Sequence, residues 1–135
     1  MNTELSSEVY WLLLTILMTS LFWVPYILNR MLELGIWNAL HDPYGDTSTK
    51  KAWANRMMQA HYNAVENLVI FAPLVIAIQI TGMNSAITET SCMIYFIARM
   101  IHYFAFTFAI PYLRVITFLI GFGVQLKLAL IVLGY

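Results

Sequence analysis

Four long runs of apolar residues dominate this chain of 135 residues and restrict what it can fold into. A helix that crosses the hydrocarbon layer of a bilayer needs about 20 mostly apolar residues. Lipid offers the backbone no hydrogen-bond partners, so each run is expected to be helical. The runs are Val9–Leu28, Ala64–Ile80, Ser91–Ile110 and Val115–Tyr135. The pattern predicts an all-α membrane protein, folded as a single four-transmembrane-helix bundle within the lipid bilayer.

The composition supports this fold class and excludes several kinds of function. Hydrophobic residues make up 61% of the chain and charged residues 10%, whereas about a quarter of the residues in soluble proteins are charged. The formal net charge is zero, and without a basic tract we expect no nucleic-acid partner. Cys92 is the single cysteine, so an intrachain disulfide is excluded. No cluster of cysteine and histidine has the spacing of metal ligands, so no metal site is expected.

The connections between the runs indicate where helices begin and end. The first connection contains HDPYGDTST, in which Asp-Pro and Gly-Asp pairs are typical of turns. Ser48 or Thr49 is expected to cap a helix that begins KKAWANRMMQ, outside the lipid. PYLR, residues 111–114, is expected to form a tight turn. The expected helices cover residues 9–28, 52–80, 87–110 and 112–134.

The distribution of positive charge predicts the orientation in the membrane. Lysine and arginine gather in or beside the first and third connections, at Arg30, Lys50, Lys51, Arg56 and Arg114. The N-terminal segment and the second connection carry none. Because cytoplasmic loops of membrane proteins are enriched in these residues, both connections are expected in the cytoplasm. In a bacterial inner membrane, both termini would then be periplasmic.

A polar stripe runs along the second predicted helix and enters the membrane. At 100° per residue its members lie within about 80° of one another, over a rise of roughly 15 Å. They are Arg56, Gln59, Asn63 and Glu66. The third run carries Arg99 and His102 on one face. Counting residues from the outer ends of the two helices places Glu66 at a depth similar to theirs, so we expect Glu66 to contact them.

Two interpretations of these intramembrane polar groups stay open. In the first they only satisfy one another and hold the bundle together. In the second they line a pocket open to the cytoplasm, where Arg56 and Arg114 attract anions. Charged groups at this depth cost several kcal/mol without a partner and usually mark a functional site.

The polar residues also resemble a known family. Arg-x₆-Asn-x-x-Glu, formed by Arg56, Asn63 and Glu66, is followed by Phe71-Ala72-Pro73, and the third run continues as ARMIHYFAF and then IPYLR. With these motifs the chain resembles the membrane-associated proteins in eicosanoid and glutathione metabolism, the MAPEG family, over nearly its whole length. The compact IPYLR form is closer to bacterial members.

The resemblance implies a left-handed four-helix bundle that assembles as a homotrimer. Enzymes of the family bind glutathione, their co-substrate, between neighbouring subunits near the cytoplasmic side. Arg114 would then be the catalytic residue that stabilises the thiolate. By the same resemblance the tripeptide would contact Arg30, Arg56, Gln59, Asn63, Glu66 and His102.

Three functional hypotheses follow from the sequence. The first is a glutathione transferase or peroxidase that acts on lipophilic electrophiles entering from the bilayer. The second is a non-catalytic accessory subunit that packs beside other membrane proteins. It is favoured by Gln59, where animal members carry a second arginine, and by Phe106, where the family often has a tyrosine. The third is a binding protein for another small anion or a lipid headgroup.

Overall fold

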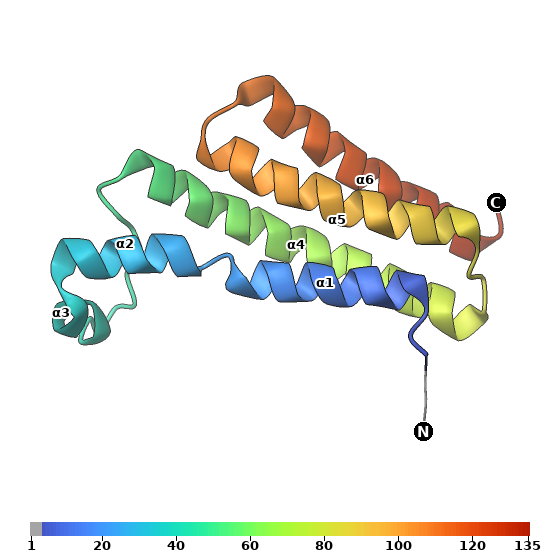
Figure 1. Cartoon of the computed structure of the whole chain (residues 1–135), viewed down its shortest axis with the longest axis horizontal. Coiled ribbons are helices and arrows are strands. Elements are labelled where there is room, and N and C mark those ends of the chain that lie inside the picture. The colour runs from blue at the N-terminus through green and yellow to red at the C-terminus, as the bar shows by residue number, and fades with distance from the viewer. Residues whose placement is uncertain (1–3) are drawn as a thin grey trace.

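The computed structural model describes residues 4–135, and it is all-helical within that range. Its elements are α1 (Ser7–Leu21), α2 (Val24–Leu34), α3 (Ile36–Leu40), α4 (Ala52–Thr81), α5 (Ala86–Thr107) and α6 (Pro111–Leu133). Figure 1 shows α1, α4, α5 and α6 running along the long axis of the molecule, with α2 extending beyond α1. The predicted all-α fold class is confirmed.

Three helical segments are long and apolar enough to cross a membrane. They are Ser7–Leu34, Ala52–Thr81 and Pro111–Leu133. The helix α5 has 22 residues but is not among them, because Arg99 and His102 interrupt its apolar sequence. Both side chains are only 2% exposed, so α5 turns these polar groups toward the other helices. The chain is an integral membrane protein.

The first predicted helix is divided in the structure. Residues 9–28 were expected to form one helix, but α1 ends at Leu21 and α2 begins at Val24. Pro25 lies in the first turn of α2, where its missing N–H leaves no hydrogen bond unmade. A proline inside a continuous helix, as Pro73 is in α4, instead removes one backbone hydrogen bond. The division therefore accommodates Pro25, and α2 continues to Leu34.

The predicted cap of the second helix is wrong. Lys51 occupies the N-cap position of α4 and makes no side-chain cap hydrogen bond. The Asn55 side chain instead fastens the preceding loop: its Oδ1 accepts from the Thr49 N–H at 3.0 Å, and its Nδ2 donates to the Thr49 carbonyl at 2.7 Å. A residue inside the helix therefore holds the preceding loop in place, while neither Ser48 nor Thr49 occupies the N-cap position.

The expected turn at PYLR is also displaced. The connection between α5 and α6 consists of residues 108–110, and Ala109 takes a left-handed conformation with φ of 56°. Pro111 begins α6, because its fixed φ suits the first position of a helix. Arg114 therefore belongs to the first turn of α6, on a rigid element beside α5.

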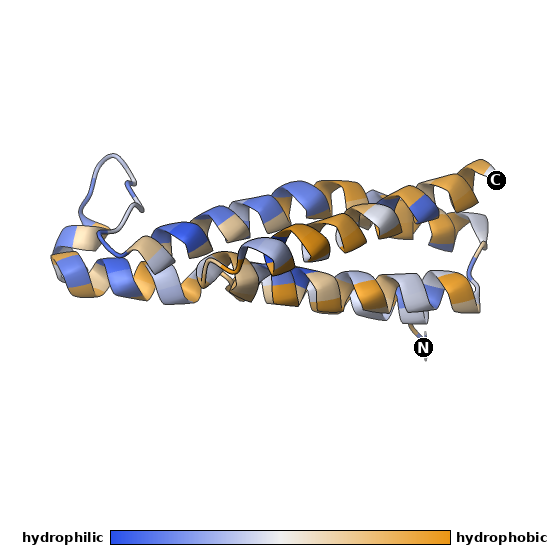
Figure 2. Ribbon diagram, turned by 90° about the horizontal axis from the view of Figure 1, so that it is seen from above, coloured by the Kyte–Doolittle hydropathy of each residue, from blue (hydrophilic) through white to orange (hydrophobic). Residues whose placement is uncertain are grey.

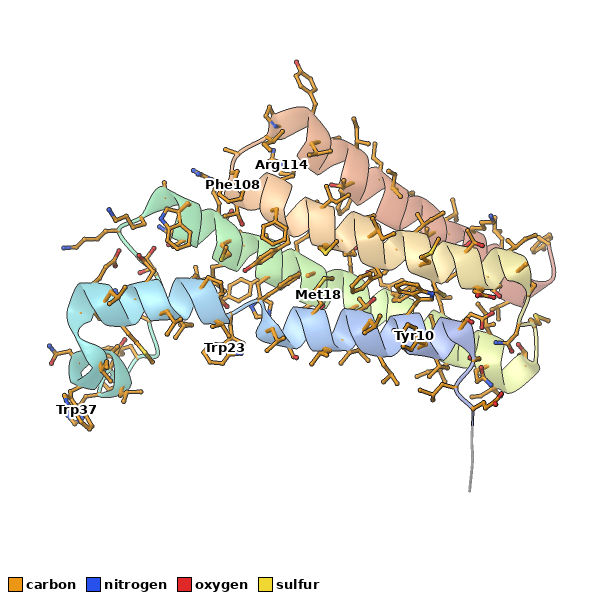
Figure 3. All side chains as sticks on the ribbon, viewed as in Figure 1. Tyr10, Met18, Trp23, Trp37, Phe108 and Arg114 are labelled. Atoms are coloured by element: carbon orange, nitrogen blue, oxygen red, sulfur yellow. The ribbon has the colours of Figure 1, made fainter. Side chains whose placement is uncertain are left out.

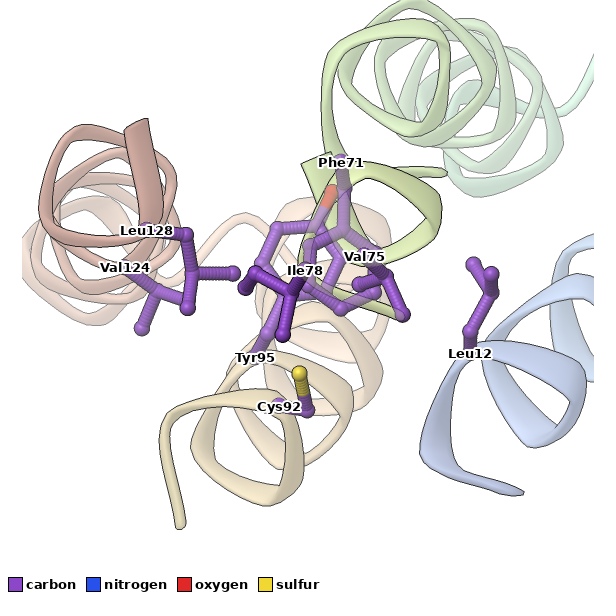
Figure 4. Close-up of a cluster of buried hydrophobic side chains, with 8 residues drawn as sticks. All are labelled: Leu12, Phe71, Val75, Ile78, Cys92, Tyr95, Val124 and Leu128. Atoms are coloured by element: carbon purple, nitrogen blue, oxygen red, sulfur yellow. The ribbon is translucent and has the colours of Figure 1, made fainter. Parts of the chain in front are cut away.

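The core between α1, α4, α5 and α6 contains a stacked pair of aromatic rings. Phe71 of α4 and Tyr95 of α5 stack with ring centroids 3.7 Å apart. Figure 4 shows them with side chains from α1, α4, α5 and α6: Leu12, Val75, Ile78, Cys92, Val124 and Leu128. Cys92 is fully buried there, which matches a packed small residue. This cluster fixes the rotation of α4 and α5 about their axes.

A second cluster holds α2 against the bundle near the division of the first helix. Phe22 stacks on Tyr103 at 3.7 Å, and the Tyr103 hydroxyl donates to the Phe22 carbonyl at 2.8 Å. Tyr26 joins the same cluster, and its hydroxyl lies 2.7 Å from His61 Nδ1. The Tyr103 hydroxyl thus satisfies the Phe22 carbonyl, which lies at the division between α1 and α2.

The two ends of the bundle differ in polarity. Figure 1 places the start of α1 and the C-terminus at one end and the α2–α3 region at the other, with the α5–α6 connection on the α3 side. Figure 2 shows hydrophilic residues concentrated toward the α3 end, while the opposite end is mostly apolar. All the lysines and arginines of the first and third connections therefore share one end of the molecule.

Candidate functional site

A hollow of about 200 Å³ opens between α4, α5 and α6. Its walls are Asn63, His102, Phe106, Arg114, Val115 and Phe118. His102 and Phe106 lie one helical turn apart on α5, and Arg114 and Phe118 do so on α6, so each pair presents a common face. Figure 3 shows Arg114 near Phe108, where α5 passes into α6. Three predicted site residues, Asn63, His102 and Arg114, are therefore brought together.

Arg99 lies buried beside this hollow with most of its donors unused. Its Nη2 donates to Asn63 Oδ1 at 2.6 Å. Its Nε and Nη1 are buried and have no hydrogen-bond partner among residues 4–135. Arg99 packs against Gly121 of α6, where an added Cβ would lie 3.5 Å from Arg99 Cδ, an ordinary van der Waals contact. A buried guanidinium with free N–H groups requires an anion or water to satisfy it.

The expected contact of Glu66 with Arg99 and His102 is not present. Glu66 is exposed, and the one ion pair within residues 4–135 joins Arg30 and Asp46. The cause is the rotation of α4: the buried Phe71 lies about 140° around the helix from Glu66. Packing of Phe71 in the core therefore turns Glu66 outward, and Asn63 meets Arg99 instead.

Asn63 is oriented by two donors. Its Oδ1 accepts from Arg99 and, at 3.3 Å, from Asn67 Nδ2. The carbonyl half of the carboxamide is thus occupied, and the Nδ2 group, which has no hydrogen-bond partner among residues 4–135, can donate to a ligand. Since Asn63 lines the hollow, it presents a donor beside the cationic groups.

Arg114 is held by an aromatic ring. Its guanidinium carbon lies 5.0 Å from the centroid of Phe106, a cation–π distance. Phe106 also packs edge-on against His102 at 5.8 Å. His102 is buried, and its Nδ1 has no partner in the described part of the chain. Phe106 therefore serves as a platform for both side chains, a role that needs no hydroxyl.

The other predicted site residues do not line the hollow of this single chain. Arg56 is half-buried, and its Nε donates at 2.9 Å to the carbonyl of Thr107, the last residue of α5. This bond satisfies an end carbonyl of the helix. Gln59 is exposed on α4, like Glu66. Both side chains are thus available to a neighbouring molecule.

Arg30 is engaged with the loop that follows α3. Its Nη2 lies 3.8 Å from Asp46 Oδ2. The backbone N–H of Ser48 donates to Asp46 at 2.9 Å. Hydrogen bonding from Ser48 lowers the pKa of the Asp46 carboxyl, and the positive charge of Arg30 lowers it to a smaller extent. Arg30 is therefore placed by the loop, away from the walls of the hollow.

Comparison with known families decides what kind of bundle this is. The model of the MAPEG family matches residues 8–134, nearly the whole chain. The chain belongs to the MAPEG family. Comparisons with curated proteins and with solved structures gave no match. The resemblance drawn from the polar motifs is thus confirmed, and the chain is a membrane protein of the family named for glutathione and eicosanoid metabolism.

Two polar residues of this MAPEG chain were missed as parts of the site. Arg99 was expected to share a face with His102 and to contact Glu66, but it was not named among the residues that contact the ligand. Gln125 of α6 is buried, and its Nε2 donates to the Asn67 carbonyl at 3.1 Å. An amide in the middle of an apolar run was the available signal. Together they extend the polar layer from the hollow into the bundle.

Proposed function

We propose that this MAPEG protein binds glutathione and joins its thiol sulfur to lipophilic electrophiles, so that the whole tripeptide is transferred. The observation that carries the proposal is the hollow lined by Arg114 and Asn63, beside the buried Arg99, whose Nε and Nη1 have no hydrogen-bond partner among residues 4–135. Glutathione has two carboxylates, an ammonium and a thiol. Arginine binds carboxylates through charge-assisted hydrogen bonds, so a carboxylate of the tripeptide suits the Asn63 side of the hollow.

The chemical step falls to Arg114. A nearby cation favours the thiolate, which is the reactive form of a thiol. The thiolate attacks an electrophilic carbon, a C–S bond forms, and the leaving group departs with its electron pair. Phe106 holds the Arg114 guanidinium in place through the contact at 5.0 Å. The apolar residues around the hollow admit substrates that dissolve in the membrane.

Assembly completes the binding site in this proposal. Ligand pockets usually enclose about 300–1,000 Å³, whereas the hollow of one chain holds about 200 Å³. It accommodates only part of a tripeptide. Gln59 and Glu66 are exposed on α4, where they would reach a ligand shared with a neighbouring copy. We therefore place glutathione between subunits of a homotrimer, with Glu66 on its ammonium.

The proposal makes a prediction for orientation. If the cationic end of the bundle faces the cytoplasm, where glutathione is available, both termini lie on the other side. A C-terminal reporter that fluoresces only in the cytoplasm should stay dark in a bacterial host, and a fusion placed in the loop after α3 should be bright. A bright C-terminal fusion would put the hollow on the wrong side and contradict the proposed co-substrate.

Binding can be tested with the protein purified in detergent. Saturating glutathione should raise the unfolding temperature of the wild-type chain and of Lys50→Ala, which removes an exposed cation at the same end of the bundle. Glu66→Gln should reduce the shift, because it weakens the contact with the ammonium. If glutathione leaves the wild-type unfolding temperature unchanged, the accessory-subunit hypothesis, which Gln59 also favours, replaces the enzyme.

A further inference from the structure

Lys127 is a further cationic group within the membrane-spanning part of the chain, apart from the candidate site. It lies on α6, about 9 Å along the helix axis from Leu133. Its side chain is exposed, and no acidic group of residues 4–135 forms an ion pair with it. A lysine at this depth keeps its apolar stem in the hydrocarbon and extends its ammonium toward the interface. There it meets the headgroups of lipids.

Two hollows flank Lys127 in the groove between α5 and α6. Lys127 and Ile87 line both of them. The larger has about 400 Å³ and is otherwise lined by Gly123, Leu126, Leu130, Ile131 and Tyr135. The smaller has about 310 Å³ and is bordered by the first turns of α5, including Thr90 and Ser91. The groove thus combines an apolar channel, one cation and a polar border.

The surroundings of the groove favour an anion. The α5 N-terminus carries the partial positive charge of a helix start. Glu89 lies in that first turn, but it lines neither hollow. The other nearby acid, Glu8, is buried and accepts a hydrogen bond from Thr88. Neither carboxylate therefore neutralises Lys127 in the described chain.

We propose that this groove binds an anionic phospholipid. The phosphate pairs with the Lys127 ammonium, and one acyl chain lies in the larger hollow along Leu126 and Leu130. Leu126 is 50% exposed and Leu130 42% exposed, so the channel opens directly to lipid. Tyr135 lies at its outer end, where aromatic residues suit the membrane interface. The site is at the opposite end of the bundle from the glutathione hollow and independent of it.

The proposal is tested by lipid retention in native mass spectrometry. The purified chain is mixed with phosphatidylglycerol or with phosphatidylcholine of the same acyl chains. The wild type should retain phosphatidylglycerol preferentially. Lys127→Met should reduce its occupancy about fivefold, the factor expected for one lysine attraction at an anionic surface. Lys127→Arg should keep the preference, and Lys50→Met, at the other end, should not change it.

Three results would overturn the assignment. Equal retention of both lipids by the wild type would show that charge does not select the occupant. Unchanged phosphatidylglycerol occupancy in Lys127→Met would remove the lysine from the site. Full displacement of the lipid by inorganic phosphate would indicate a free anion site. A Lys127→Met protein that keeps the wild-type unfolding temperature and mass of assembly excludes misfolding and a subunit contact as explanations.

Discussion

Asn63→Leu is expected to lower the free energy of unfolding by about 2–3 kcal/mol in the absence of any ligand. Asn63 provides the only hydrogen bond that the buried Arg99 guanidinium makes within residues 4–135. Hydrogen bonds to charged groups contribute about 1.5–3 kcal/mol, and a buried charge left without its partner is destabilising. Reversible unfolding in detergent, followed by circular dichroism, measures the loss.

Two further variants make the interpretation specific. Glu66→Leu should change stability by less than about 0.5 kcal/mol, as expected for an exposed position. Asn63→Leu combined with Arg99→Met should recover part of the loss, because replacing both partners by apolar groups removes the stranded charge. If Glu66→Leu destabilised the chain more than Asn63→Leu, the partner of Arg99 would have been assigned wrongly.

Phe71→Ala is expected to have the largest effect on the fold, a loss of about 3–5 kcal/mol. Phe71 is fully buried and stacks on Tyr95 at 3.7 Å. The substitution leaves a cavity between α4 and α5 and removes the contact that sets the rotation of α4. Because that rotation places Asn63 beside Arg99, the variant should also weaken glutathione binding. Thermal unfolding and the glutathione-induced shift check the two effects.

Ile70→Ala is the matched control for the packing of α4. It removes a large side chain one position away, but Ile70 is 53% exposed and faces the lipid side of the helix. A change within about 0.5 kcal/mol is expected. Equal losses in Ile70→Ala and Phe71→Ala would mean that α4 does not turn the face containing Phe71 toward the core.

The long helices could be predicted because lipid requires helical backbone and long apolar runs. The breaks within them depend on single residues whose effects compete. Pro25 was compatible with a kinked helix or with a new helix start, and the packing of Phe22 on Tyr103 decides for the start. The α4 cap was assigned from Ser48 and Thr49, whereas Asn55 reaches back to the loop. Contacts of this kind form only once the loop has folded against the helix, so the sequence pattern does not reveal them.

Three of the predicted site residues, Asn63, His102 and Arg114, do line one hollow, but the contact predicted for Glu66 is absent. Spacing placed Asn63 and Glu66 on one stripe, and helix depth placed Glu66 level with Arg99. Depth is only one coordinate, and the rotation of α4 is set by Phe71 and Val75 in the core. The motifs carried the family assignment correctly, since the family match covers residues 8–134. The contribution of residues from a second copy of the chain to the binding site stays a prediction.

The ultraviolet absorbance of bound glutathione tests the central proposal most directly. Near neutral pH, adding glutathione to the purified wild-type protein should produce a thiolate absorbance if, as proposed, the Arg114 guanidinium stabilises the charged sulfur. Arg114→Ala should abolish this signal while some thermal stabilisation by glutathione persists, since in the proposal Asn63 would still bind the tripeptide. Lys50→Ala should retain the signal. Absence of a thiolate signal in the wild type at saturating glutathione, or an undiminished signal in Arg114→Ala, would contradict the proposed chemistry.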